Sequence, residues 1–160
     1  MKPLRSVSLA LALVAPGALA QTAGFGAVSL GMSRATAITA AGPEALVGPL
    51  CGGAEGVLFP TPQGDAMAMF DQGQVSEMAL TPPGDGAERP MEACAATARS
   101  LLRAPGAFTT QENAGIVETL GTLATPRGEL RAISRWSSRT GACYLTLHWL
   151  APGATSRIVN

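Results

Sequence analysis

The stretch 66–80, AMAMFDQGQVSEMAL, predicts two antiparallel strands joined by a tight turn. Ala66–Phe70 and Gln74–Leu80 are largely apolar and have the length of ordinary strands. Asp71-Gln72-Gly73 lies between them and supplies a glycine that can take a positive φ. The sequence therefore predicts a β-hairpin in the first half of the chain, and this hairpin indicates an antiparallel sheet.

Helices are predicted on both sides of this hairpin. Ser33 is a suitable N-cap for a helix over Arg34–Ala41, and Gly42-Pro43 ends that helix. Pro90 can occupy the first turn of a second helix that runs to about Ala104, where Pro105-Gly106 follows. The remaining predicted strands are Val57–Phe59, Ile116–Leu123, Leu130–Trp136 and Ala142–Leu150.

The order of these elements is helix then strands, followed by helix then strands, with the loop 81–86 between the two sets. This order predicts an α+β fold, in which two short helices pack on one face of an antiparallel sheet. The halves, about 26–80 and 90–150, could be diverged copies of one unit. We expect a single domain over residues 21–150 and a flexible tail over 151–160 that has little to pack.

Residues 1–20 have the pattern of a secretory signal peptide. Lys2 and Arg5 give a positive start, an apolar run over 9–15 follows, and Ala18-Leu19-Ala20 provides small residues for cleavage. The alternative is a membrane anchor, but the apolar run is shorter than the roughly 20 residues that a spanning helix needs. We expect export to a bacterial periplasm or beyond, and no membrane span in the mature protein.

Charge in the mature chain is nearly balanced, with nine arginines and eleven acidic residues after residue 20. This balance gives no electrostatic argument for nucleic acid as a partner. The charge is uneven, however, because residues 21–90 carry a net charge of −5 and residues 91–160 one of +3. Mutual attraction of the halves is the simpler interpretation, and a cationic surface on the second half is the alternative.

Three cysteines remain after the predicted cleavage, and an oxidising compartment favours their pairing. Cys94 lies on an apolar helical stripe, and Cys143 alternates in register with Leu145 and Leu147 on a strand. We therefore expect a Cys94–Cys143 disulfide, which leaves Cys51 free. A Cys51–Cys94 bridge and three unbridged thiols are the alternatives.

Gly26–Ser33 leads into the first predicted helix, and Met69–Val75 forms the hairpin turn. Both motifs resemble those of small envelope modules of the SmpA/OmlA type and of β-lactamase-inhibitor-like proteins. The resemblance covers about residues 26–80 and implies a helix-on-sheet fold that binds other molecules. It implies no catalytic residue, and this chain has no lipidated cysteine after its predicted signal peptide.

Residues that could carry chemistry are few. His148 is the only histidine, its alternation with Tyr144 and Thr146 predicts a surface position, and we expect no metal site or cofactor. Asp65 and Asp71 could form a carboxylate pair, although solvated turn residues are the simpler interpretation. The sequence has no nucleophile elbow, phosphate-binding loop or Cys-x-x-Cys motif, so we expect no catalysis, although an unrecognised catalytic site stays open.

Arginines recur every four residues from Arg127 to Arg139, and Arg131 and Arg135 share one face of their predicted strand. They could be solvated and paired with Glu118 or Glu129. Alternatively they could form a protein interface together with Trp136 and Trp149, because arginine and tryptophan are common interface anchors. The methionines of the first hairpin fill the core or, in the alternative, line a ligand groove.

We therefore expect an exported domain that binds a protein or an envelope component without catalysis. One alternative is a small hydrolase or small-ligand-binding protein, which requires a pocket where titratable groups converge. Another is an inhibitor of a secreted enzyme, which requires a protruding loop such as residues 81–89. The partner and the oligomeric state are left open.

Overall fold

The computed structural model describes residues 23–102 and 107–158. Within them the chain is an α+β protein dominated by antiparallel strands, with two short helices, which confirms the predicted class. The predicted signal peptide lies outside the described residues, as do the proposed helix stop at Pro105-Gly106 and residues 159–160.

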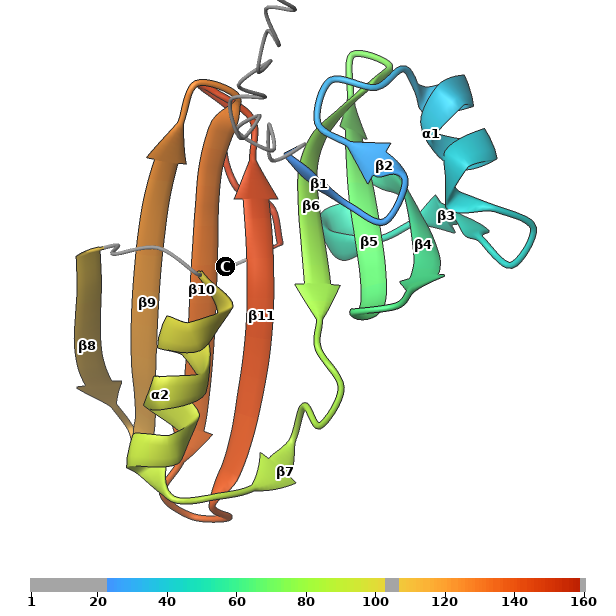
Figure 1. Cartoon of the computed structure of the whole chain (residues 1–160). Coiled ribbons are helices and arrows are strands. Elements are labelled where there is room, and N and C mark those ends of the chain that lie inside the picture. Colours follow the sequence, from blue (N-terminus) through green and yellow to red (C-terminus); the bar gives the residue numbers. More distant parts are fainter. Residues whose placement is uncertain (1–22, 103–106, 159–160) are drawn as a thin grey trace, which may run out of the picture.

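The main sheet consists of two meanders that meet through their last strands (Figure 1). The first contains β3 (Leu46–Pro49), β4 (Glu55–Thr61), β5 (Gly64–Asp71) and β6 (Gln74–Thr81). The second contains β8 (Ala107–Asn113), β9 (Ile116–Thr125), β10 (Gly128–Ser137) and β11 (Ala142–Leu150). The strand order is β3-β4-β5-β6-β11-β10-β9-β8, so β3 and β8 form the edges of the described sheet.

The hairpin of β5 and β6 is confirmed and extends slightly beyond its predicted bounds. Its strands pair from Asp65 opposite Thr81 to Asp71 opposite Gln74. Gln72 and Gly73 have φ values of 48° and 76°, and two positive values are what a two-residue type I′ turn requires. The turn sequence therefore sets the register next to the turn, and a β-bulge between Met69 and Phe70 shifts it by one residue farther along the hairpin.

Helix α1 spans Arg34–Ala41, as predicted. The Ser33 hydroxyl accepts a hydrogen bond from the N–H of Thr36 at 3.2 Å, which satisfies one unpaired donor of the first turn. Gly42 follows with a φ of 90°, in the region that favours glycine. Ala37 is fully buried, and the helix contacts β4 and β6.

Helix α2 spans Met91–Leu101 and ends earlier than predicted, and Pro90 precedes it as the N-cap residue. Cys94, Ala98 and Leu102 are buried, which confirms the apolar stripe. The helix contacts β9, β10 and β11, as Figure 1 shows.

Several short elements are not predicted by the sequence patterns. They are the edge strands β3 and β8, the hairpin β1 (Gly24–Phe25) with β2 (Val28–Ser29), the strand β7 (Ala87–Glu88) and the short helix η1 (Cys51–Gly53). The strand predicted at 57–59 extends to Glu55–Thr61. None of the helices among the described residues combines the length and apolarity needed to cross a bilayer.

Strand register assigns side chains to two faces of the sheet, because directly opposite residues share a face. Trp149 lies opposite both Leu130 and Met78, on what we call the core face. His148 lies opposite both Arg131 and Ala79, on what we call the back face.

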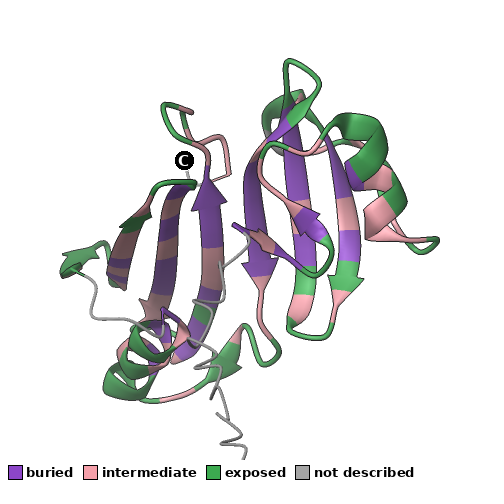
Figure 2. Cartoon of the chain, turned by 45° about the horizontal axis from the view of Figure 1, so that its top comes forward, coloured by how far each residue is buried: buried purple, intermediate pink, exposed green. Residues whose placement is uncertain are grey.

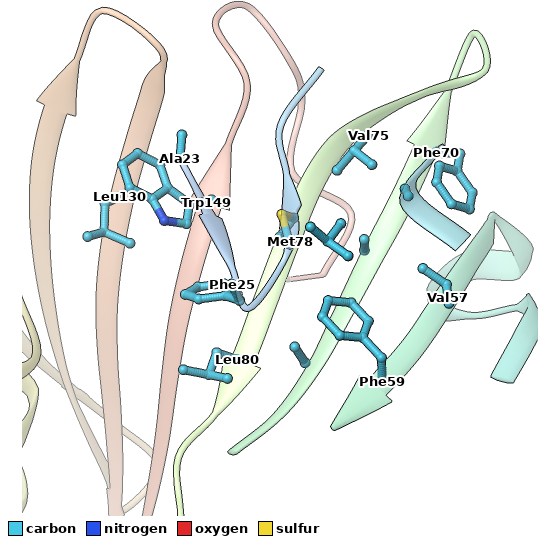
Figure 3. Packing of buried hydrophobic residues seen from close by; sticks show 14 of the residues in the cluster. Ala23, Phe25, Val57, Phe59, Phe70, Val75, Met78, Leu80, Leu130 and Trp149 are labelled. Atoms are coloured by element: carbon cyan, nitrogen blue, oxygen red, sulfur yellow. The ribbon is translucent and has the colours of Figure 1, made fainter. Parts of the chain in front are cut away.

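Most buried side chains belong to the central strands (Figure 2), and the largest cluster lies on the core face where the two meanders meet. Phe25 of the β1–β2 hairpin lies over this junction, close to Met78 and Trp149 (Figure 3). Other members are Ala23, Val57, Phe59, Phe70, Val75, Leu80 and Leu130. The N-terminal hairpin thus helps to join the two meanders.

Candidate functional site

The cysteine prediction is confirmed where the structure describes it. Cys94 of α2 and Cys143 of β11 form a disulfide with a Cα–Cα distance of 5.7 Å, and both residues are buried beside Leu145 and Trp136. The disulfide attaches α2 to the sheet. The side chain of Cys51 lies outside the described part of the structure, so its predicted free state stays a prediction.

The arginine–tryptophan surface considered as an alternative is not assembled. Arg131 and Arg135 point to the back face, whereas Trp136 and Trp149 lie on the opposite face. Arg131 pairs with Glu129 at 2.5 Å, and Arg135 pairs with Glu118 at 2.7 Å. The simpler interpretation of these arginines, pairing on the sheet surface, is therefore confirmed.

Both tryptophans have structural positions instead. Trp149 is only 4% exposed and belongs to the main core cluster (Figure 3). Trp136 is half-buried against the disulfide, and its indole N–H donates to the backbone carbonyl of Arg89 at 2.9 Å. The alternative in which both tryptophans flank an exposed cationic stripe is therefore wrong.

His148 is fully buried, which corrects its predicted surface position. Its Nε2 lies 2.7 Å from Oε1 of Glu77, a side chain that is only 1% exposed. The two residues lie diagonally across the β6–β11 pairing, on the back face. Alternation along the strand correctly places His148 on the other face of the sheet from Leu145 and Leu147. The back face, however, is covered where His148 lies.

The cover is residues 151–158, which follow β11 and bind the same carboxylate. Glu77 accepts hydrogen bonds from the Ser156 hydroxyl at 2.7 Å and from the backbone N–H groups of Arg157 and Ile158. These residues belong to the predicted flexible tail over 151–160. Since they are held by a buried charge, residues 156–158 form part of the packed structure.

Electrostatics favour the ionised form of Glu77. Burial opposes its ionisation, but the hydrogen bonds from His148, Ser156, Arg157 and Ile158 outweigh burial and lower the pKa of Glu77 to about 2. We call this arrangement the Glu77 latch. The Nδ1 atom of His148 is buried and has no hydrogen-bond partner among the described residues.

The Glu77 latch resembles an acid–base pair in composition, but its position suits a structural role. Both side chains are sealed from solvent, and neither lines the two larger hollows described below. Glu77 belongs to no catalytic or binding motif in the sequence. One sequence feature does point to it, because Glu77 stands beside the apolar run Met78-Ala79-Leu80 in a strand near the middle of the chain.

The carboxylates Asp65 and Asp71 do not form a pair. Asp65 is near the start of β5 and Asp71 at its end, and both are exposed. Arg157 approaches Asp71 at 3.7 Å. Their interpretation as solvated residues near turns is therefore the one that fits the structure.

The loop 81–89, considered as an inhibitory loop, is tied to the sheet at several points. The Asp85 carboxylate accepts a hydrogen bond from the N–H of Leu145 at 2.5 Å, and the N–H of Gly86 donates to Cys143. Arg89 donates from its side chain to the carbonyl of Gly84 at 2.9 Å. The loop therefore directs part of its polar groups inward.

Two hollows of appreciable size lie on the described surface. One of about 700 Å³ lies between the β5–β6 turn, Arg127 and residues 151–154. The other, of about 430 Å³, lies at the edge of the first meander and is largely apolar; we call it the β3 groove. Concave, mostly apolar surfaces with a few polar groups are typical binding sites, which makes the β3 groove the stronger candidate.

The β3 groove is built by the pairing of three neighbouring strands. Leu46 of β3 lies opposite Leu58 of β4, which in turn lies opposite Met67 of β5, so the three side chains form an apolar row across the back face. Glu44 and Asp65 add two exposed carboxylates to the lining. Met67 thus takes the groove position that the sequence left as an alternative, whereas Met69 and Met78 are fully buried.

Comparison of this chain with protein-family models, with curated proteins and with solved structures gives no match.

Proposed function

We propose that this chain is an exported, non-catalytic domain that binds another protein, and that the edge of its first meander is the binding surface. One observation carries the proposal. Leu46 of the edge strand β3 is 69% exposed, and its side chain lies in the apolar row with Leu58 and Met67 on the back face. Val47 is 44% exposed on the same strand, and its side chain points to the core face. An exposed apolar side chain that borders an apolar groove at an open sheet edge is typical of a surface that binds a partner.

The export part of the proposal rests on the sequence pattern of residues 1–20. The Cys94–Cys143 disulfide is compatible with an oxidising compartment such as the periplasm or the cell exterior. The resemblance of residues 26–80 to envelope modules of the SmpA/OmlA and β-lactamase-inhibitor-like kinds agrees with a binding role.

Catalysis is not part of the proposal. The one histidine bonds to a buried carboxylate, and that carboxylate holds residues 156–158. A hydrolase would need such groups to converge on a space that a substrate can enter. The exposed apolar edge of β3 instead supports binding.

We also propose that the two halves are diverged copies whose helices cover the same sheet face. Each half has one helix followed by four strands of the main sheet, and the halves meet through equivalent last strands, β6 and β11. Ala37 of α1 and Leu102, the C-cap residue of α2, belong to the same core cluster, which supports helix packing on one face.

Site-specific photo-crosslinking in the native host tests the binding surface. A benzoylphenylalanine at Val47 should give a discrete adduct with another protein after irradiation. The matched control places the same group at Gln111, an exposed residue of the other edge strand β8. Adducts at neither position, or the same diffuse adducts at both, would contradict the proposed surface.

A further inference from the structure

The backbone of β3 has a limited capacity to pair with another strand. The N–H of Leu50 donates to the carbonyl of Ala54 at 2.8 Å, which makes their pair a hydrogen-bonded one. Such pairs alternate along antiparallel strands, so the backbone groups of Leu46 and Gly48 bond towards β4 and those of Val47 and Pro49 point away. No described strand pairs with that outer side.

Pro49 limits the backbone hydrogen bonds that this edge can form with a partner strand. Pro49 has no N–H, so the outer side of β3 presents the N–H of Val47 and the carbonyls of Val47 and Pro49. A partner strand can therefore form one complete backbone pair at Val47 and little beyond it. Side-chain contacts in the adjoining β3 groove must supply the remaining affinity and the specificity.

The groove combines an apolar floor with negative charge. Leu46, Leu58 and Met67 form the floor, and Glu44 and Asp65 contribute the carboxylates. Within the described residues neither carboxylate takes part in an ion pair. The surrounding half of the chain is acidic as well, since residues 21–90 carry a net charge of −5.

We infer that the β3 groove recognises an extended polypeptide segment that pairs with Val47, places an apolar side chain on Leu46 and Met67, and directs a Lys or Arg at Glu44 and Asp65. The inference rests on the proposed function and names the chemistry of the partner. Charge complementarity selects this occupant, because an acidic segment would bring like charges to the two carboxylates. The mode of recognition is addition of a strand to a sheet edge.

An array of fluorescent ten-residue peptides tests this chemistry with the purified protein. Val and Thr alternate in all peptides, and matched members carry either Lys or Glu at both ends. Lys-ended peptides should bind about tenfold more tightly than their Glu-ended partners, which corresponds to about 1.4 kcal/mol. Fluorescence anisotropy at low salt gives the two dissociation constants, and 0.5 M NaCl should reduce the ratio.

Substitutions in the β3 groove test whether the preference for Lys-ended peptides depends on its residues. Glu44→Gln combined with Asp65→Asn should reduce the Lys-to-Glu ratio below about threefold, and Leu46→Ser should weaken binding of every peptide. Glu112→Gln, at an exposed position of β8, is the matched charge control and should change neither quantity. Circular dichroism of each variant establishes that the fold is kept.

Several outcomes would overturn the inference. They are equal binding of Lys-ended and Glu-ended peptides, a preference that survives in the Glu44/Asp65 variant, no peptide binding at all, or a dimer of this chain that Leu46→Ser dissociates in sedimentation experiments. A crosslinked adduct at Val47 together with any of the first three results would retain protein binding as the function and reject only the basic, extended partner. If Val47 gives no crosslinked adduct and the protein shows no preference for Lys-ended peptides, both proposals are rejected.

Discussion

Replacing Glu77 by Gln removes a charge that is buried between β6 and residues 156–158. The side chain is 1% exposed and accepts hydrogen bonds from His148, Ser156, Arg157 and Ile158. Gln keeps the size of the side chain but offers these donors a neutral carbonyl oxygen, and it adds an NH₂ group that needs an acceptor of its own. The change therefore tests the charge with little change in volume.

The expected loss of stability follows from the pKa. A fall in the pKa of Glu77 from its ordinary 4.5 to about 2 corresponds to about 3 kcal/mol of folding free energy at neutral pH. Because the folded-state pKa is the lower one, this contribution is complete above pH 4.5 and disappears as the pH falls towards 2. Glu77→Gln should therefore lower the free energy of unfolding by about 3 kcal/mol at pH 7 and by much less near pH 2.

Urea unfolding followed by circular dichroism between pH 7 and pH 2 measures both quantities. Glu129→Gln is the matched control, because Glu129 pairs with Arg131 but remains 38% exposed, and exposed pairs contribute about 1 kcal/mol or less. A loss below about 1 kcal/mol for Glu77→Gln at pH 7 would refute the reasoning. So would a difference between the variant and the wild type that stays constant over the whole pH range.

Two further predictions concern the disulfide and the first helix. Reduction of Cys94–Cys143, measured by urea unfolding with Cys51→Ala in both samples, should cost about 4 kcal/mol, because the bridge joins residues 49 positions apart; an unchanged midpoint would contradict this. Ser33→Ala should lower the free energy of unfolding by about 1 kcal/mol through loss of the α1 cap, whereas Ser100→Ala on the exposed side of α2 should change it by less than about 0.5 kcal/mol. Equal effects of the two serine variants would show that the cap does not stabilise the protein.

The elements predicted well are those whose signals are local. The bounds of α1 follow from Ser33 and Gly42, and the β5–β6 turn follows from Gly73, because caps and tight turns depend on the nearest residues. The Cys94–Cys143 bridge is also predictable, since each cysteine lies on the apolar side of its own element. A pattern within each element was enough to indicate that both face one core.

The elements missed are those defined by a neighbour. β3 contains Gly48 and Pro49, and β8 is mostly polar, so neither has the alternation of a half-buried strand. β3 is a strand because it pairs with β4, and β8 is a strand because it pairs with β9. The β3 groove could not be predicted for the same reason, because its apolar row exists only when three strands are in register.

The Glu77 latch depends on contacts still further apart in sequence. Glu77 and His148 are 71 residues apart, and Ser156 is 79 residues from Glu77. Alternation correctly gives the face of His148 but not what covers that face. Only the pairing of β6 with β11, and the return of residues 151–158 across it, buries the two side chains.

The position of β11 also constrains the order in which the protein can fold. This strand follows every other strand in sequence, yet it lies in the middle of the sheet and joins the two meanders. Each meander can pair its neighbouring strands early, because hairpin contacts are local. Until β11 has been synthesised, however, the first meander keeps β6 as an open apolar edge, and the carboxylate of Glu77 lacks both His148 and residues 156–158. A nascent chain therefore stays exposed to wrong strand pairing until nearly its whole length is available, which makes β6 the strand that a chaperone would have to protect.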